Sequence, residues 1–171
     1  LRQGSNLELL IESMIKLNSI NIEYELHIIG TGEEESYYRN KYSHKWIHWY
    51  GKIYDQSKIV EISKLCRLGC YPGDAGLSVV HYFSLRLPAL VHDDMYSHMG
   101  PEPSYIESGL NGFTFSKSET DIGSVIKSVF NLSREDYFNV SDGAFKKYRK
   151  LNSPSFGKRM IAAIKGIDAN E

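Results

Sequence analysis

The segment that decides the fold is Tyr71-Pro72-Gly73-Asp74-Ala75-Gly76-Leu77-Ser78-Val79-Val80-His81. It follows a short apolar run, passes through small residues and continues into residues that favour a helix. The first turn of a helix has unpaired backbone N–H groups and a positive dipole end, which together attract phosphate. Gly73 and Gly76 allow a ligand to approach the backbone closely, and Ser78 adds a hydroxyl donor. The segment therefore predicts either an anion-binding loop or an ordinary turn between a strand and a helix.

Short apolar runs alternate with helical patterns on both sides of this segment. We expect strands at 24–29, 47–50, 68–71, 88–91 and 113–115. We expect helices at 5–17, 33–42, 57–65, 76–85, 121–130, 141–149 and 155–167, the first opened by a capping box of Ser5 and Glu8. This alternation is typical of βαβ units. It predicts an α/β fold with one Rossmann-like, doubly wound parallel sheet, in a single domain over residues 1–171.

The composition narrows the possible partners. The 171 residues include 20 basic and 21 acidic ones, for a net charge of −1, so nothing favours nucleic acid or an anionic membrane surface. No apolar run approaches the roughly 20 residues of a membrane span. The chain begins at Leu1 without Met, and we expect it to be a piece of a longer protein.

The loops at the carboxyl ends of the strands are the places to search for a site, because open α/β sheets bind ligands there. They cover residues 30–32, 51–54, 72–78 and 92–102. Gly30-Thr31-Gly32 lacks the third glycine of a dinucleotide fingerprint, so it is either a plain turn or part of a binding floor. Lys52 is placed either to meet a phosphate or to face water.

The six histidines raise the question of a metal. His92, Asp93, Asp94 and His98 lie close together in the sequence, but their spacing matches no standard zinc set, and we expect no metal here. A hydrogen-bonding or proton-carrying histidine is the stronger alternative. Histidines outside these loops are expected to be structural or at the surface, namely His27, His44 and His48.

A series of short motifs occurs in a definite order along residues 1 to about 130. The motifs are Ser5-Asn6-Leu7, Ile29-Gly30-Thr31-Gly32, Tyr50-Gly51, Tyr71-Pro72-Gly73, Gly76-Leu77-Ser78, Leu87-Pro88-Ala89-Leu90, Pro101-Glu102 and Asn111-Gly112. In this order they resemble the C-terminal, donor-binding domain of family 4 (group 1) retaining glycosyltransferases. The resemblance implies one half of the two-domain GT-B fold.

The chain departs from this family at two places. The family has two glutamates, seven residues apart, around the glycine-rich helix start. Here Gly73 or Asp74 occupies the first position and His81 the second, as in a subgroup of surface-polysaccharide transferases. The lysine of the family's diphosphate-binding Arg/Lys pair falls near Ser5, and its arginine either precedes Leu1 or is replaced by Arg2.

The resemblance implies that a nucleoside-diphosphate sugar, a UDP- or GDP-sugar, is the donor in bacterial lipopolysaccharide or capsule synthesis. It implies a base site at Tyr50, Gly51 and Lys52. It implies a diphosphate site at the backbone N–H groups of Gly76, Leu77 and Ser78, with Gly30 and Gly32 along the floor, and Gly73 is a further expected substrate-binding residue. Asp74 would contact sugar hydroxyls and His81 the ribose or a phosphate, as the catalytic residues. No cofactor and no metal are implied.

The resemblance also implies an N-terminal acceptor domain and a hexosyltransferase activity that this chain alone does not have. The enzyme would be cytoplasmic, or peripheral at the inner face of the plasma membrane through its other parts. Two alternatives remain, a non-catalytic signalling or nucleotide-sensing module and a UDP-sugar epimerase-like domain. A receiver module needs acidic residues at the first strand end, where this chain has glycines, and an epimerase needs more carboxylates in its cleft.

Overall fold

The computed structural model describes residues 4–20, 24–118 and 121–166. Its strands are β1 (Leu26–Ile29), β2 (Ile47–Gly51), β3 (Gly69–Cys70), β4 (Ala89–His92) and β5 (Gly112–Phe115). Its helices are α1 (Leu7–Asn18), α2 (Glu35–Lys41), α3 (Gln56–Ser63), α4 (Ser78–Ser84), α5 (Ile122–Phe130), α6 (Arg134–Leu151) and α7 (Phe156–Lys165), with a 3-10 helix, η1, at Glu102–Tyr105. The alternation of strands and helices expected from the sequence is confirmed.

All strand pairs are parallel, but their hydrogen bonds form two sheets. β1 pairs with β2, with Leu26 opposite Ile47, and β4 lies between β3 and β5. The common doubly wound strand order is 3-2-1-4-5-6. In the described residues, the pair β1–β2 and the three strands β3–β5 are not hydrogen-bonded to each other in one such continuous sheet. The α/β class with parallel strands is therefore confirmed, with the sheet in two parts.

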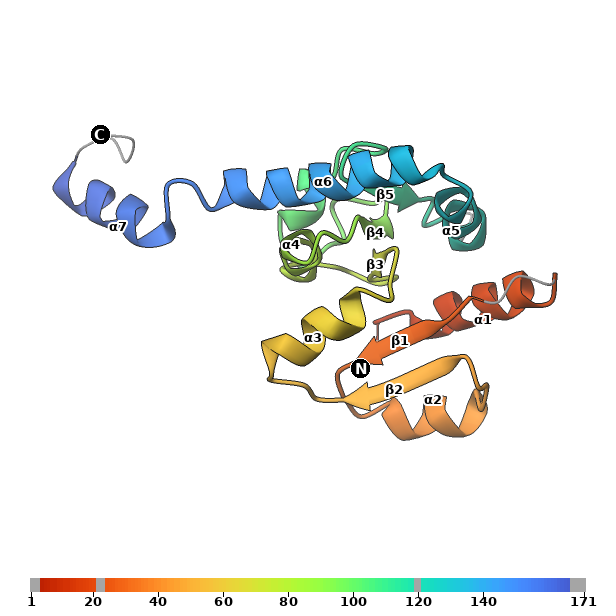
Figure 1. Ribbon diagram of the computed structural model, residues 1–171. Helices are drawn as coiled ribbons and strands as arrows, with labels where there is room; N and C mark the ends of the chain where they lie inside the picture. The colour runs from red at the N-terminus through yellow and green to blue at the C-terminus, as the bar shows by residue number, and fades with distance from the viewer. Residues whose placement is uncertain (1–3, 21–23, 119–120, 167–171) are drawn as a thin grey trace.

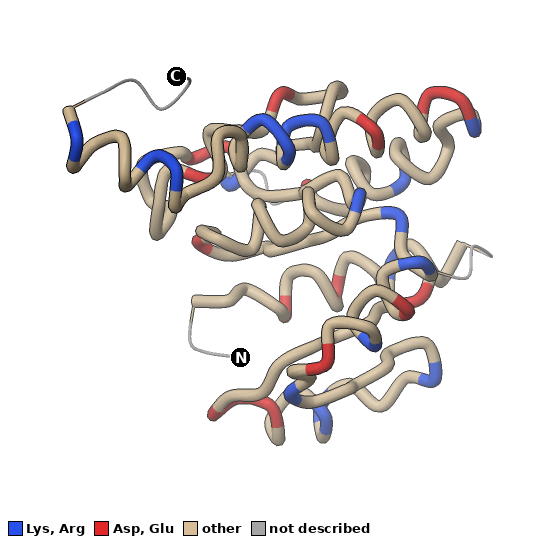
Figure 2. The backbone as a smooth tube through the Cα atoms, turned by 60° about the vertical axis from the view of Figure 1, so that its left-hand side comes forward, with Lys and Arg blue, Asp and Glu red and all other residues tan. Residues whose placement is uncertain are grey.

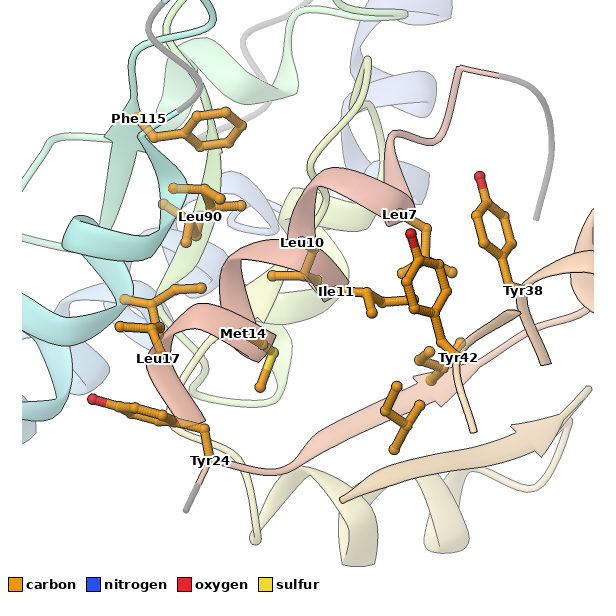
Figure 3. Packing of buried hydrophobic residues seen from close by; sticks show 14 residues of the cluster. Leu7, Leu10, Ile11, Met14, Leu17, Tyr24, Tyr38, Tyr42, Leu90 and Phe115 are labelled. Carbon is orange, nitrogen blue, oxygen red and sulfur yellow. The ribbon is translucent and has the colours of Figure 1, made fainter. Parts of the chain in front are cut away.

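Helix α1 joins the two parts through one hydrophobic core (Figure 3). Its buried face consists of Leu7, Leu10, Ile11, Met14 and Leu17. On one side this face packs against Tyr38 of α2 and against strands β1 and β2. On the other side it packs against Leu90 of β4 and Phe115 of β5. Each fully buried side chain of this kind contributes roughly 1.5–3 kcal/mol. The core therefore holds the two parts of the sheet together without strand pairing between them.

A second cluster lies under α4 and α6. Val79 and Phe83 of α4 pack with Val91 of β4 and Ala144 of α6, all fully buried. Figure 1 shows α6 running across the top of the three-stranded sheet and continuing to α7, which extends away from it. In α7 the one buried residue is Ala162. The helix α7 is thus attached by little packing.

Two details of the helices differ from the sequence-based expectations. The capping box is wrong, because the N-cap is Asn6 in a left-handed conformation (φ 50°) and makes no side-chain bond. Glu8 instead contacts Lys41 and the hydroxyl of Tyr42. The helix expected at 141–149 begins earlier, at Arg134, because Ser133 accepts a bond from the amide of Asp136.

The charged residues are mixed over the surface, as Figure 2 shows. Lys and Arg lie near Asp and Glu in several elements, whereas the charged residues of α7 and of the second half of α6 are all basic. None of the described helices is both long and apolar enough to cross a bilayer.

Candidate ligand-binding site

The loop between β3 and α4 packs against the segment before α1. A Cβ atom on Gly73 would lie 2.0 Å from the carbonyl oxygen of Gly4 and 2.8 Å from the carbonyl carbon of Ser5. Only a glycine permits this approach, because both atoms are backbone. The position corresponding to the family's lysine, Ser5, therefore lies beside the glycine-rich loop, as the resemblance implies.

The end of this loop presents backbone N–H groups. Among the described residues, none accepts a hydrogen bond from the amides of Gly76, Leu77 or Ser78. Leu77 is 75% exposed and Ser78 is half-buried, whereas Gly76 is buried against Met99 and Glu102. The preceding amide, Ala75, is occupied because it donates to Nδ1 of His98 (3.0 Å). Within the described part of the chain these three successive amides are thus unpaired, those of Leu77 and Ser78 on accessible residues, and such groups at a helix start attract anions.

Polar side-chain atoms without partners lie around the same loop. The Oγ atoms of Ser5 and Ser78 and Oε2 of Glu102 are buried and make no hydrogen bond within the described part of the chain. A Cβ on Gly76 would be 3.9 Å from that Glu102 oxygen. A buried polar atom left unpaired costs about 1–3 kcal/mol. A polar ligand that reached these atoms would recover that cost.

Asp74, in the middle of the loop, connects it to β4 and β5. Its Oδ1 lies 3.2 Å from Nε2 of His92, which is fully buried at the end of β4. It also lies 3.6 Å from the ammonium of Lys117, which follows β5 and pairs with Asp94 at 3.3 Å. This cluster fixes the loop at the carboxyl edge of the three-stranded sheet.

The charges of this cluster are set by burial and by the neighbours. Burial favours the neutral form of Asp74, but the hydrogen bond from His92 and the charge of Lys117 outweigh it, and the pKa of Asp74 lies below its usual value. Burial and the neighbouring His98 lower the pKa of His92. At neutral pH we therefore assign a carboxylate to Asp74 and a neutral ring to His92, with the proton on Nε2.

His98 holds the loop in place from the other side. Its ring stacks on that of His92 with centroids 3.9 Å apart. Because Nδ1 accepts from the amide of Ala75, the proton is on Nε2, which donates to the carbonyl of His92 at 3.1 Å. Asp74, His92 and His98 lie close enough to hold a metal, with ligand atoms within 4.8 Å of one another. Both nitrogens of His98 are, however, already engaged by backbone groups.

The loops after β1 and β2 contact each other. The amide of Gly30 donates to the carbonyl of Gly51 at 2.8 Å, and both residues have positive φ, 123° and 66°. Tyr50 and Lys52 beside them are exposed. The hydroxyl of Tyr50 bonds Nδ1 of His27 at 2.9 Å. The residues expected at the base thus share one strand end.

The positions of the other expected site residues do not test their expected roles. His81 lies on α4 with an exposed side chain, so its role stays a prediction. Gly32 lies in the turn before α2. Arg2 lies outside the described residues. Sequence reasoning missed Lys117, and its only signal is its position just after an expected strand.

A cavity of about 550 Å³ opens at the opposite edge of the sheet. It is lined by the residues that precede β3 and β4, including Arg67 and Arg86, and by Arg134 and Tyr137. Because ligands of open α/β sheets bind at the carboxyl ends of the strands, we do not assign this cavity to the donor.

No protein-family model and no curated protein matches the sequence. Solved structures do match the fold. The C-terminal domain of a group 1 glycosyltransferase, LpcC from Francisella tularensis, superposes with a TM-score of 0.68 at 13% identity, over 88% of this chain and 80% of that one. The chain has the fold of this C-terminal domain.

Two longer proteins contain the same fold. TarM matches with a TM-score of 0.69 at 16% identity, over 87% of this chain and 30% of its own. HepE from Anabaena, solved in complex with UDP and glucose, matches with a TM-score of 0.68 at 14% identity, over 88% and 41%. The chain therefore spans less than half of these two proteins.

Proposed function

We propose that the chain binds a nucleoside-diphosphate sugar, as the donor-binding domain of a retaining hexosyltransferase of bacterial surface-polysaccharide synthesis. The observation that carries the proposal is the set of available amides at Gly76, Leu77 and Ser78, at the carboxyl edge of the sheet. The HepE structures with UDP and UDP-glucose support a UDP-sugar as the donor.

The diphosphate binds to these amides. The ion pairs beside the loop reduce the electrostatic repulsion between the diphosphate and the acidic side chains there. Lys117 compensates Asp74 and Asp94, so their carboxylates repel an incoming anion less. Glu102 contributes an acceptor beside Gly76 that suits a hydroxyl of the sugar or ribose rather than a phosphate. Catalysis then consists of stabilising the departing diphosphate through the fixed amides. Asp74 contacts sugar hydroxyls and His81 the ribose or a phosphate.

The base stacks at the end of β2. Tyr50 offers an exposed ring there, next to Gly51 and Lys52. Gly30 and Gly32 form the floor of this part of the site. Aromatic rings at such positions bind bases by stacking, at about 1–3 kcal/mol for each base.

Sugar transfer also requires a site that binds the acceptor, which these residues do not supply. The acceptor is held by an N-terminal domain across a cleft, since donor and acceptor must be held in register. The chain alone therefore binds donor but does not transfer sugar.

The proposal is tested by removing one amide hydrogen. Leu77→Pro deletes that N–H, and the φ of −53° at this position suits proline. Because the leucine side chain is exposed, Leu77→Ala is the matched control that keeps the N–H. Isothermal titration with UDP should show about tenfold weaker binding for Leu77→Pro and wild-type binding for Leu77→Ala. Equal affinity of the two variants would refute the proposed site.

A further inference from the structure

Three side chains converge on the face of β1 and β2 that points away from α1. His27 of β1 and His48 of β2 are direct partners across the parallel pair, and Glu25 immediately precedes β1. Alternation along the strands puts Ile28 and Ile47 into the core and both histidines on the other face. The imidazole rings stack with centroids 4.8 Å apart.

The distances among these groups suit a small divalent ion. Oε2 of Glu25 lies 3.4 Å from Nε2 of His27 and 3.6 Å from Nε2 of His48. All three ligand atoms lie within 4.8 Å of one another. Tetrahedral zinc with bonds of about 2.0–2.2 Å separates its ligand atoms by about 3.3–3.6 Å. The two oxygen-to-nitrogen distances therefore need little adjustment, but the stacked rings, whose planes differ by 16°, must rotate so that both Nε2 lone pairs point at the ion.

The nitrogen atoms are available for coordination. Nε2 of His48 is buried and makes no hydrogen bond with any described residue. Nδ1 of His27 is bonded to the hydroxyl of Tyr50 at 2.9 Å, which leaves Nε2 directed to Glu25. A ligating histidine commonly has such a partner on its other nitrogen.

The other histidine cluster provides a useful contrast. In Asp74, His92 and His98, both nitrogens of His98 are engaged with backbone groups, so coordination would break a bond that holds the loop. The Glu25 cluster has no such conflict. The Glu25 side chain is 59% exposed and gives the ion a path to water, whereas His27 is 6% exposed and Nε2 of His48 is buried.

We propose that Glu25, His27 and His48 form a binding site for a divalent transition-metal ion of the zinc class. Two imidazoles and one carboxylate hold the ion, and water completes its coordination. By linking neighbouring strands, the ion stabilises the two-stranded part of the sheet. The site departs from the sequence-based expectation of no metal; its three ligands take no part in the proposed donor site, although Tyr50, which bonds His27, is also the proposed base-stacking residue.

The test is a titration of chelator-treated protein with zinc chloride, followed by calorimetry and thermal unfolding. We expect one ion per chain and a Tm that rises by about 5 °C or more at one hundred times Kd. Glu25→Gln and His48→Gln each remove one ligand and should weaken binding at least tenfold. His44→Gln removes an exposed histidine outside the cluster and should bind as the wild type does.

Glu25→Gln keeps the proposal testable even if His48→Gln unfolds, because the Glu25 side chain is mostly exposed. Absence of binding by the wild-type chain would overturn the proposal. So would equal affinity of the wild type and Glu25→Gln. Loss of the ion in His98→Ala, with retention in Glu25→Gln, would move the site to the other cluster and equally overturn it.

Discussion

Nε2 of His92 lies 3.2 Å from Oδ1 of Asp74, which ties the loop after β3 to the end of β4. The two residues are 18 positions apart, and the histidine is completely buried. The loop that offers its amides to a ligand is therefore held by a hydrogen bond from a buried, neutral imidazole to a partly exposed carboxylate.

This pair makes the stability of the chain depend on pH. The pKa of His92 is lowered by burial and by His98, so the unfolded chain takes up a proton first as the pH falls below about 6.5. The pKa of Asp74 is also lowered, and its contribution is lost below about pH 4. The free energy of unfolding should thus fall from pH 7 to pH 5, by at most about 1.4 kcal/mol per pH unit for one proton.

Urea unfolding of His92→Gln should show a shallower decline over that range, whatever its overall stability. The exposed His44→Gln should leave the slope unchanged. A wild-type slope in His92→Gln would mean that another group titrates.

Lys117→Gln should weaken UDP binding about tenfold, equivalent to about 1.4 kcal/mol. The substitution leaves Asp74 and Asp94 without their cation beside the loop that receives the diphosphate. Lys146→Gln removes a lysine that pairs with Asp142 on α6, and it should bind UDP normally. If calorimetry gave both variants the same affinity, Lys117 would have no part in the site.

Gly73→Ala should destabilise the chain by about 1–3 kcal/mol, because the new methyl group would overlap the backbone of Gly4 and Ser5. Gly157→Ala, in α7, meets nothing within 4 Å and should be neutral or slightly stabilising. The free energies of unfolding in urea distinguish the two. Equal free energies of unfolding for Gly73→Ala and Gly157→Ala would show that Gly4 and Ser5 do not pack closely against Gly73.

Deletion of residues 153–171 should change Tm by less than about 4 °C, because the one buried side chain described in α7 is Ala162. Ala144→Asp, which places a charge between α6 and α4, should lower Tm far more. A large loss of Tm on deletion would show that α7 is integral to the fold.

The sequence predicts the elements well because their signals are local. The apolar run ending at Gly30 and the small-residue loop after Cys70 are both where they are expected. The prediction of a capping box is wrong because Glu8 makes tertiary contacts instead. Its carboxylate bonds Lys41 of α2 and the hydroxyl of Tyr42, the residue after α2. Such partners, more than 30 residues away in the chain, leave no trace in a local pattern.

The candidate site also combines residues that a local pattern reveals with residues that only the fold brings together. The loop from Gly73 to Ser78 is recognisable from its glycines, but Lys117 is not, since only the pairing of β5 with β4 brings it to Asp74. Likewise His27 and His48 look unrelated in sequence, and the register of β1 on β2 makes them neighbours.

The most direct test of the donor site is an NMR titration of the ¹⁵N-labelled chain with UDP and, separately, with uridine. The account predicts that UDP shifts the amide signals of Gly76, Leu77 and Ser78 more than any others, and that uridine leaves them in place. Unmoved signals at these three amides with saturating UDP, or shifts gathered instead around Arg67 and Arg134 at the opposite edge, would contradict it.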